Sequence, residues 1–439
     1  MTDRAIRQIE ILREWIEQAA PHLNSTLSVR LWDGSIVPLG PDAKRDILLA
    51  INSPEAVRRL MFSPRLMTVF EIYAENLIDI EGGTPLDAVR RWDHIAVLKF
   101  ARSLNKMQLA RTLWPFVRKA KPRKGGEAAL GYEKKVAGKV SEGRNDKEMI
   151  QFHYDVSNEF YALFLDPEMV YSSGYFKTPD TPLEQAQKDK LEMICRRLRL
   201  KPGERLLDVG CGWGGLVCHA AKNHGVNALG VTLSKAQYDY ATAKVKKLGL
   251  EDKVTIELRD YRTVDEPEAF DKIAQIEMFE HVGFDNHDAH FRQMHRLLRP
   301  RGLYLHQAST RLCTPRAEDF RKKTPYQDVI TRFIFPGGEL DYIGLTLTNL
   351  ERHRFEVHDV EAWREHFQLT LEHWVRRLWE NREAARAEIG WPKTRLWLLY
   401  FSLFAESFRR STISVFQTLA SKRQTGPSGL PLTREDLYE

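Results

Sequence analysis

Four glycines stand at the expected junction of a strand and a helix, in the segment LLDVGCGWGG. They are Gly210, Gly212, Gly214 and Gly215. Glycines at such a turn let the backbone bend tightly and pack closely against a nucleotide cofactor. Because dinucleotide enzymes share this kind of loop, the loop alone predicts a nucleotide site without selecting the cofactor.

Two features favour S-adenosylmethionine (SAM) over a nicotinamide dinucleotide. Asp208 ends the strand before the loop, where a carboxylate suits a cationic amino-acid moiety. No acidic residue stands near position 230, where a chain that binds NAD would hold the ribose. We therefore expect SAM as the cofactor.

Two later segments supply further candidate contacts. In GVTLSKAQ, Thr232 and Gln237 suit the ribose hydroxyls and the carboxylate of the cofactor. Ser234 and Gln237 also have the spacing of a helix capping box. The two roles are compatible, because a cap that holds the first turn of the helix also holds the Gln237 side chain in position for the cofactor. Asp260 and Tyr261 follow the next expected strand, where adenine would lie.

The elements that must position these residues alternate between short apolar strands and amphipathic helices. This order predicts an α/β fold with a parallel sheet, in which ligands bind beyond the carboxyl ends of the strands, where the strand order reverses. We expect strands at 205–209, 228–232, 253–258, 272–277 and 303–309, and helices at 214–224, 234–248 and 286–298.

Residues 1–118 are expected to form a separate small α+β domain, without a visible catalytic constellation. Asp33-Gly34 lies between alternating apolar and polar residues, which is the pattern of a hairpin with a tight primed turn. Helices are expected over 3–19 and 54–76. A lipid, membrane or dimer role is suspected for this domain.

Charge is concentrated between the two expected domains. The chain has 439 residues, a length that favours two domains, and a net charge of +6. Arg118–Lys147 holds ten basic and four acidic residues. We expect residues 119–148 to be a flexible basic linker drawn to an anionic membrane, at about 1 kcal/mol per basic residue. A merely solvated linker is the alternative.

Compartment and redox state follow from simple patterns. The N-terminus carries neither a secretory signal nor an anchor, so a cytoplasmic start is expected. The apolar run Leu396–Ala405 is about half of the ~20 residues that cross a bilayer, and it predicts a buried helix. Reduced thiols and no metal are expected, because no metal-ligand spacing includes Cys195, Cys211, Cys218 or Cys313.

Several longer motifs resemble the cyclopropane fatty acid synthases, including the mycobacterial mycolic acid cyclopropane synthases. The resemblance covers nearly the whole chain, and LWDGS…PLG is similar to the extra domain of the longer bacterial members. The other motifs are HYDVSNEFYALFLDPEMVYSSGYF (153–176), LLDVGCGWGG, GVTLSKAQ, EMFEHVG (277–283), FPGG (335–338), EAWREHFQLTLEHW (361–374) and RLWLLYFSLFAESF.

The resemblance implies a Rossmann-like class I SAM-dependent methyltransferase fold with a mostly parallel seven-stranded sheet. The methyltransferase domain would span 149–425, with insertions for a lipid tunnel, and a tail would span 426–439. Together with Asp208 and Gly214 of the loop, the implied SAM contacts are Tyr154, Tyr171, Ser172, Gly210, Gly212, Thr232, Gln237, Asp260, Tyr261 and the Ile276 backbone.

The implied substrate is a cis-unsaturated phospholipid acyl chain in a hydrophobic tunnel. Removing ~16 carbons from a bilayer costs on the order of 13 kcal/mol at roughly 0.8 kcal/mol per CH2, which a wet groove would not replace. The enzyme is therefore expected in the cytoplasm, bound peripherally to the inner face of the membrane. A homodimer and a partner reductase that acts on the product are left open.

The implied chemistry needs a base. An alkene that takes up a methyl group becomes a carbocation, which must then lose a proton. In the resembled enzymes a bound bicarbonate is implied as that base, and Glu280 and His306 match its glutamate and histidine partners. Three other partners depart from the family: Ser173 replaces a cysteine, Ala308 an isoleucine and Phe367 a tyrosine.

These departures lead to a hypothesis about the product. A lost tyrosine hydroxyl removes a donor that a buried anion needs. Asp341 and Tyr342 replace the usual Pro-Ser, and Tyr342 is a candidate to restore a hydroxyl. We expect a remodelled anion site, leave bicarbonate binding open, and hypothesise a methyl-branched or methylene-bearing chain instead of a cyclopropane. The catalytic candidates are Glu280, His306, Ser173, Phe367 and Tyr342.

Other classes of function predict different features. The plant alkaloid N-methyltransferases have similar segments, so a small amine is the alternative acceptor. A nucleic-acid methyltransferase is disfavoured, because the chain lacks the Pro-Cys and Asp/Asn-Pro-Pro-aromatic motifs and its basic stretch lacks interleaved aromatic residues. A lipid-binding protein without enzyme activity would not explain the cofactor residues.

Overall fold

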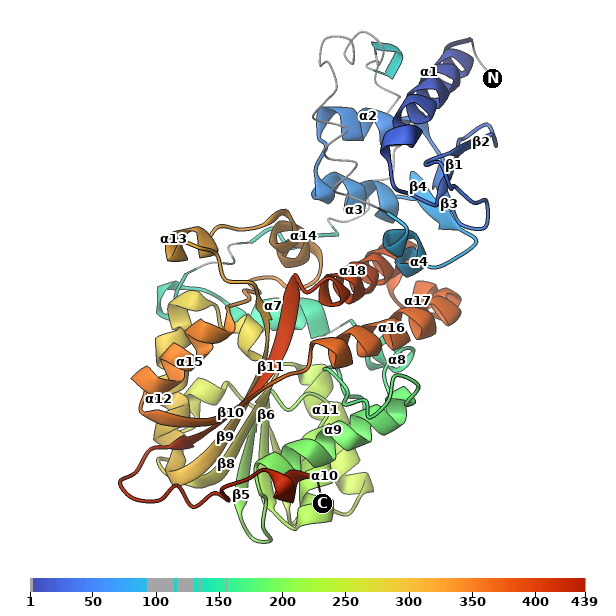
Figure 1. Ribbon diagram of the computed structural model, residues 1–439. Coiled ribbons are helices and arrows are strands. Elements are labelled where there is room, and N and C mark those ends of the chain that lie inside the picture. Colours follow the sequence, from blue (N-terminus) through green and yellow to red (C-terminus); the bar gives the residue numbers. More distant parts are fainter. Residues whose placement is uncertain are drawn as a thin grey trace. The chain divides into compact units, whose positions relative to one another are not determined.

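The computed structural model describes residues 3–92, 114–116, 130–134, 136, 138–154 and 156–438. The expected linker therefore lies partly outside the described residues, at 119–129, 135 and 137. Contacts divide the chain into two units, whose elements are labelled in Figure 1. The first unit holds Met1–Gly131, Thr324–Val329 and Val375–Glu406, and the second holds Tyr132–Lys323, Ile330–Trp374 and Ser407–Glu439.

The first unit is built on a four-stranded sheet with the order β2-β1-β3-β4. Helix α1 buries Ile9, Leu12 and Ile16, which recur at helical spacing on one face, in the cluster that includes Val29 and Val37 of the sheet. The elements are α1 (Asp3–Ala19), η1 (Ala20–His22), β1 (Ser28–Arg30), β2 (Ile36–Pro38), β3 (Leu48–Ile51), α2 (Pro54–Phe62), α3 (Leu66–Ala74), β4 (Ile78–Glu81), α4 (Pro85–Arg90), η2 (Trp114–Phe116) and α17 (Arg382–Ile389).

The predicted hairpin is present, but its turn is wider than expected. The amide of Leu31 donates to the carbonyl of Ser35 at 2.8 Å, so Trp32, Asp33 and Gly34 form the loop. A two-residue type I′ turn needs a positive φ at both central residues, and here only Gly34 has one, at +89°. Asp33 instead accepts a hydrogen bond from the Ser35 amide at 3.0 Å.

The helical stretch expected over 54–76 is present but divided. Two helices, α2 and α3, occupy this range, and Ser63-Pro64 lies between them. A proline disfavours the helical conformation of the residue before it, which explains the break.

Helix α18 (Trp391–Arg409) contains the expected buried apolar run, since Leu396 and Phe401 are 2% and 0% exposed. Arg395 on this helix donates to the carbonyl of Ile78 at 2.7 Å and pairs with Asp79 at 2.9 Å. These long-range contacts explain why Val375–Glu406 groups with the N-terminal residues and interrupts the continuous domain expected over 149–425. Within the described part of the chain, no helix is long and apolar enough to cross a membrane.

The second unit is built on a seven-stranded sheet with the order β10-β11-β9-β8-β5-β6-β7. All strands run in parallel except β11, which is antiparallel to both β9 and β10. The strands are β5 (Arg205–Val209), β6 (Asn227–Thr232), β7 (Val254–Leu258), β8 (Phe270–Ile276), β9 (Leu298–Arg311), β10 (Phe355–Ala362) and β11 (Ile413–Lys422). The five expected strands and the parallel sheet are confirmed.

Helices cover both faces of this sheet (Figure 1). Leu206 of β5 packs in a cluster with α9, α10 and α11, whereas Leu207 packs in a cluster with α12 and α15. The helices are η3 (Val140–Glu142), α7 (Asp146–Tyr154), α8 (Asn158–Ala162), α9 (Leu183–Arg197), α10 (Gly215–His224), α11 (Lys235–Lys247), η4 (Tyr261–Thr263), η5 (Phe279–His281), η6 (Phe284–Asn286), α12 (His287–Leu297), α13 (Ala317–Phe320), α15 (Ile343–Arg352) and η7 (Glu435–Leu437). Helices α14 (Pro325–Phe333), α16 (Arg364–Glu380) and α18 cross the division between the units.

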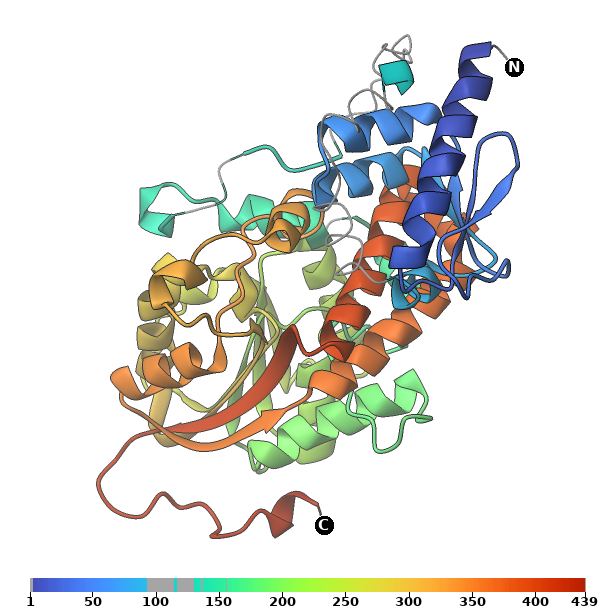
Figure 2. The same cartoon turned by 45° about the horizontal axis from the view of Figure 1, so that its top comes forward.

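The ends of the second unit differ from the expected boundaries. The linker was expected to reach residue 148, but α7 begins at Asp146 and Arg144 is only 5% exposed. Arg144 was expected among the basic charges of the flexible linker, whereas its side chain is buried in an ion pair. At the other end, the C-terminal segment returns to α9 (Figure 2), where Arg199 and Asp436 pair at 2.8 Å.

Candidate active site

A pocket lies at the carboxyl ends of β5, β6 and β8, where the strand order reverses. Ten of the twelve residues expected to hold SAM line it, namely Tyr154, Tyr171, Ser172, Asp208, Gly210, Gly212, Thr232, Gln237, Tyr261 and Ile276. The other two, Gly214 and Asp260, lie outside its lining.

The glycine loop turns the chain from β5 into α10. Gly210 has a φ of +83°, and its amide donates to the carbonyl of Val231 at 3.0 Å. Gly214 also has a positive φ, +79°, but it caps α10, and a Cβ there would lie 3.1 Å from the Cβ of Ala241. Gly214 therefore fixes the start of the helix, while Gly210 and Gly212 face the pocket.

The loop after β6 is held by side-chain hydrogen bonds. The Thr232 hydroxyl donates to Oε1 of the Gln237 side chain at 2.8 Å. The backbone N–H of Gln237 donates to the Ser234 hydroxyl at 3.3 Å. The cap at Ser234 and the pocket-facing pair of Thr232 and Gln237 therefore coexist.

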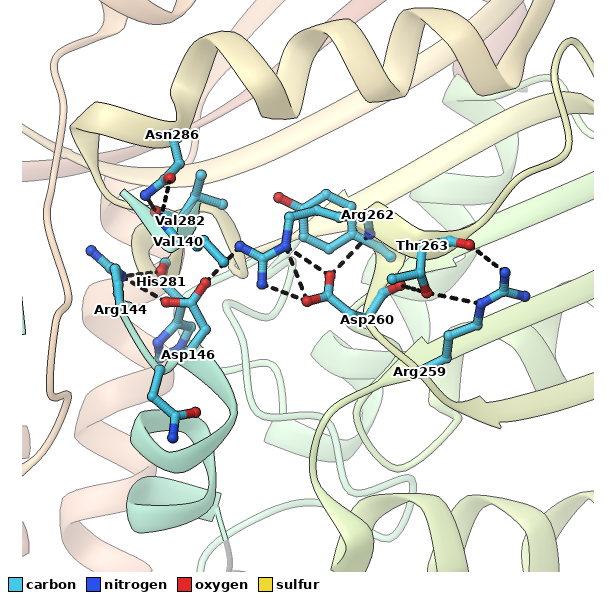
Figure 3. A network of polar contacts seen from close by, with 12 residues as sticks. Val140, Arg144, Asp146, Arg259, Asp260, Arg262, Thr263, His281, Val282 and Asn286 are labelled. Atoms are coloured by element: carbon cyan, nitrogen blue, oxygen red, sulfur yellow. Dashed lines mark hydrogen bonds and ion pairs between the residues drawn. The ribbon is translucent and has the colours of Figure 1, made fainter. Parts of the chain in front are cut away.

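A chain of alternating charges holds the rim of the pocket (Figure 3). Asp260 accepts from the Arg262 amide at 2.9 Å and pairs with its guanidinium. Arg262 reaches across to Asp146 at 2.8 Å, and Asp146 pairs with Arg144 at 2.6 Å. Arg144 in turn donates to the carbonyl of His281 at 2.6 Å.

This network explains why Asp260 is absent from the lining. Its carboxylate is used to hold Arg262, and it is Arg262 and Asp146 that face the pocket. Arg262 follows the predicted contacts Asp260 and Tyr261 directly in the sequence, but its partner Asp146 is distant in sequence, so its role was not predicted.

Buried charges gather at the end of β5. Burial raises the pKa of Asp208 to about 7 and lowers the pKa of Lys190 to about 8. The Lys190 ammonium donates to the Ser172 hydroxyl at 2.7 Å. Lys190 was not predicted, although a lysine on the buried face of α9, one turn after Gln187, is a signal that the sequence contains.

Glu277 is the second unpredicted residue. It follows β8 with a φ of +50°, which is unusual for a residue with a side chain. Its Oε1 accepts from the amide of Ser173 at 3.0 Å and from Gln307 at 2.5 Å. Burial raises the pKa of Glu277 to about 8, with a further contribution from the charge of Glu280.

The two candidates that match the family's anion site lie near the end of β9. Glu280 accepts from the Ser309 amide at 2.6 Å, and burial raises its pKa. The Tyr304 hydroxyl and Nδ1 of His306 are 3.1 Å apart, and burial lowers the pKa of His306 to about 3. Oε2 of Glu280 and Nε2 of His306 are buried without a hydrogen bond to any described residue.

The other residues that depart from the family lie on separate elements, namely α16, β9 and the segment before α15. Phe367 packs its ring 4.8 Å from that of Phe408, and Ala308 is buried in the core of the sheet. Tyr342 precedes α15 and packs on Phe320 at 4.8 Å. Tyr342 does not line the pocket.

Its neighbour Asp341 is the residue that interacts with Glu280. Asp341 is 1% exposed and accepts from the Thr346 hydroxyl at 2.6 Å. Burial, with a smaller contribution from the charge of Glu280, raises the pKa of Asp341 to about 7.

Aromatic side chains lie beside these carboxylates. Tyr171 stacks on Trp374 with ring centroids 5.0 Å apart, and Tyr154 meets Trp213 edge-on at 6.3 Å. Aromatic faces and carboxylates both stabilise a positive charge, and burial strengthens both effects. The site therefore suits a reaction in which a cation develops away from water.

Comparison with known proteins agrees with this geometry. The family described as mycolic acid cyclopropane synthetase matches residues 141–418. A probable fatty acid methyltransferase of Pseudomonas putida is 34% identical over 421 residues, which cover 96% of this chain and 98% of that protein. The cyclopropane-fatty-acyl-phospholipid synthase of Escherichia coli is 35% identical over 271 residues, covering 62% of this chain and 66% of that protein.

A solved structure shows the same fold. A mycolic acid cyclopropane synthase complexed with SAH and CTAB superimposes with a TM-score of 0.60 at 33% identity, covering 64% of this chain and 100% of that one. The predicted fold class and the resemblance are therefore confirmed. The chain belongs to the mycolic acid cyclopropane synthetase family and is an enzyme of the SAM-dependent methyltransferase kind.

Proposed function

We propose that this enzyme transfers the methyl carbon of SAM to the cis double bond of an unsaturated phospholipid acyl chain, and that the product is a methyl-branched or methylene-bearing chain. The observation that carries the finer part is the hydrogen bond from the Ser173 amide to the Glu277 carboxylate. The names of the relatives, a fatty acid methyltransferase and a cyclopropane-fatty-acyl-phospholipid synthase, support the acyl-chain substrate.

The pocket residues fit SAM. Gly210 and Gly212 leave room for close approach, Asp208 is a buried carboxylate for the amino-acid moiety, and Thr232 with Gln237 offers oxygen and nitrogen atoms to the ribose. When bound, SAM supplies a methyl group on a sulfonium, which is an electrophile. Tyr154 and Tyr171 present the aromatic faces that would lie near this positive charge.

The residues present do not fit a bound bicarbonate. The Ser173 amide already donates to Glu277, and Phe367 has no hydroxyl to donate. The charge of Glu280 acts on both Glu277 and Asp341, so an added anion would meet like charge in a dry site. We therefore assign no step to bicarbonate.

In the proposed reaction Glu277 takes the proton. The π electrons of the alkene form a bond to the methyl carbon while the bond from that carbon to sulfur breaks, which leaves S-adenosylhomocysteine and a carbocation on the acyl chain. The aromatic rings and the carboxylates stabilise the cation. A C–H proton then passes to the Glu277 carboxylate, and its electron pair forms the new double bond of the product.

The test is a lipid analysis. The full-length enzyme is incubated with SAM and vesicles of an unsaturated phospholipid, and the acyl chains are analysed by gas chromatography with mass spectrometry. A product heavier by one CH2 unit, with a double bond and without a ring, is expected, and because a cyclopropane has the same mass the fragmentation pattern distinguishes the two. A cyclopropane as the main product would contradict the finer proposal, and turnover of small amines without turnover of lipid would contradict both parts.

We also propose that the enzyme meets its substrate at an anionic membrane surface, through the basic residues of the stretch 119–148 other than the buried Arg144. Cosedimentation with vesicles should be strong when they contain anionic phospholipid and weak when they contain only zwitterionic phospholipid. It should also fall as salt rises, because basic residues near a membrane are screened within a Debye length. Equal binding to both vesicle types would contradict this assignment.

A further inference from the structure

Three potential metal ligands come together outside the pocket, where α9 packs beside α10. They are Cys195 near the end of α9, His219 in α10 and His224 at its last residue. One ligand atom from each side chain, a sulfur or a ring nitrogen, lies within 4.8 Å of the other two. Neither helix alone holds this set, so it depends on the packing of the two helices.

A carboxylate contacts both imidazoles of this set. Glu192 lies one turn before Cys195 on α9, and its Oε2 is 3.0 Å from Nε2 of His219 and 3.1 Å from Nε2 of His224. Both imidazoles therefore converge on one carboxylate oxygen. The cluster thus offers one thiol, two imidazoles and one carboxylate.

We propose that Cys195, His219, His224 and Glu192 bind a structural Zn2+ ion. Zinc prefers tetrahedral sets of sulfur, imidazole nitrogen and carboxylate oxygen, whereas magnesium and calcium prefer oxygen alone. Zinc bond lengths place neighbouring ligand atoms about 3.3 to 3.6 Å apart. The ligand atoms of Cys195, His219 and His224 lie within 4.8 Å of one another, whereas the Glu192 carboxylate does not lie within that limit of all three, so binding requires Cys195 and Glu192 to move toward a common ion.

The surroundings support a built site. Oε1 of Glu192 accepts from Nε of Arg196 at 3.0 Å, which leaves Oε2 for the cluster. Nδ1 of His219 lies 3.1 Å from the side-chain amide nitrogen of Asn223, from which it accepts. When Nε2 binds a metal, Nδ1 carries the proton, and the Asn223 amide must turn over so that its oxygen accepts from Nδ1–H. Cys195 lies at the buried side of the cluster. The two imidazoles are each 19% exposed, so an ion can reach the cluster from solvent.

The position of the cluster defines its role. It would fasten α9, which carries Lys190, to α10, which begins at the end of the glycine loop. The ion would therefore stabilise the support of the cofactor pocket, and it takes no part in methyl transfer.

The experiment titrates the full-length protein, without a histidine tag and with Cys313→Ser to remove an exposed thiol, with Co2+ after treatment with a chelator. We expect one Co2+ per chain, the visible bands of tetrahedral cobalt, and a near-ultraviolet thiolate charge-transfer band that Zn2+ abolishes. Cys195→Ala should remove the charge-transfer band, and His224→Gln should weaken Co2+ binding by more than about 100-fold.

Cys218→Ser is the matched control. Like Cys195, Cys218 is a buried cysteine, but it lies in α10 and outside the proposed ligand set. The charged residues near its thiol are Lys244 and Glu168. This variant should keep both spectral features, and retained SAM binding by calorimetry would show that each variant is folded. The absence of stoichiometric Co2+ binding, or an unchanged charge-transfer band in Cys195→Ala, would overturn the proposal.

Discussion

The amide of Ser173 donates a hydrogen bond of 3.0 Å to the carboxylate of Glu277 at the edge of the cofactor pocket. The resemblance to the cyclopropane synthases implies an anion held by this segment. In this protein the carboxylate of Glu277 accepts the hydrogen bond of the Ser173 amide in place of a bound anion. A fixed carboxylate needs no binding step, and Gln307 orients it through a second hydrogen bond at 2.5 Å.

If Glu277 is the base, Glu277→Gln should lower turnover by about 100-fold or more, the usual contribution of a positioned base. Glutamine keeps an oxygen that accepts from the Ser173 amide but does not take up a proton. Single-turnover methyl transfer from labelled SAM measures the loss, and calorimetry should give a SAM affinity close to that of the unchanged enzyme. The control is Glu251→Gln, which removes an exposed carboxylate. Normal turnover of the Glu277 variant would exclude it as the base.

The pH dependence should follow the same group. Burial raises the pKa of Glu277 to about 8, and a base acts only when it is deprotonated. kcat/KM should therefore rise with pH and level off above about 8. The residual activity of Glu277→Gln should lack this rise. A profile that is flat from pH 6 to 9 in the unchanged enzyme would contradict the assignment.

Glu280 is expected to act on the cation and not on the cofactor. Its carboxylate is buried and interacts with Asp341, and Oε2 has no hydrogen bond to the described residues. Glu280→Gln should abolish most turnover, because a buried carboxylate that faces a developing cation contributes several kcal/mol. The dissociation constant of SAM, measured by calorimetry, should change little. Near-normal activity would remove Glu280 from the mechanism.

The charged chain at the rim predicts a loss of cofactor affinity. Arg262 pairs with both Asp146 and Asp260, and charge-assisted hydrogen bonds contribute about 1.5 to 3 kcal/mol each. Arg262→Gln should therefore weaken SAM binding about tenfold or more and lower the free energy of unfolding by about 2 kcal/mol. Asp265→Asn, which removes the exposed partner of Arg296, is the control and should change neither quantity. Unchanged SAM affinity in Arg262→Gln would show that the network does not shape the pocket.

The sequence predicted local structure well, because local structure depends on short patterns. The glycine loop, the strands around it and the buried run of α18 all follow from residue spacing. The Lys190, Asp208 and Glu277 group could not be assembled in this way, since its members come from α9, β5 and the end of β8.

One error and one omission have the same physical origin. Arg144 was placed in the linker because its partners Asp146 and the His281 carbonyl are brought near it only by the fold. The two histidines near Cys195 were not recognised as its neighbours, because they come from another helix. Tertiary contacts decide such cases, and spacing along the chain does not record them.

The most direct test of the central claim uses SAM with a fully deuterated methyl group and an unsaturated phospholipid in vesicles. If Glu277 removes a proton from the acyl chain and a methyl group remains, mass spectrometry should show products that retain three deuterium atoms. A methylene product formed by loss from the new methyl group would retain two and carry a double bond. A saturated cyclopropane that retains two deuterium atoms as the main product would contradict the account.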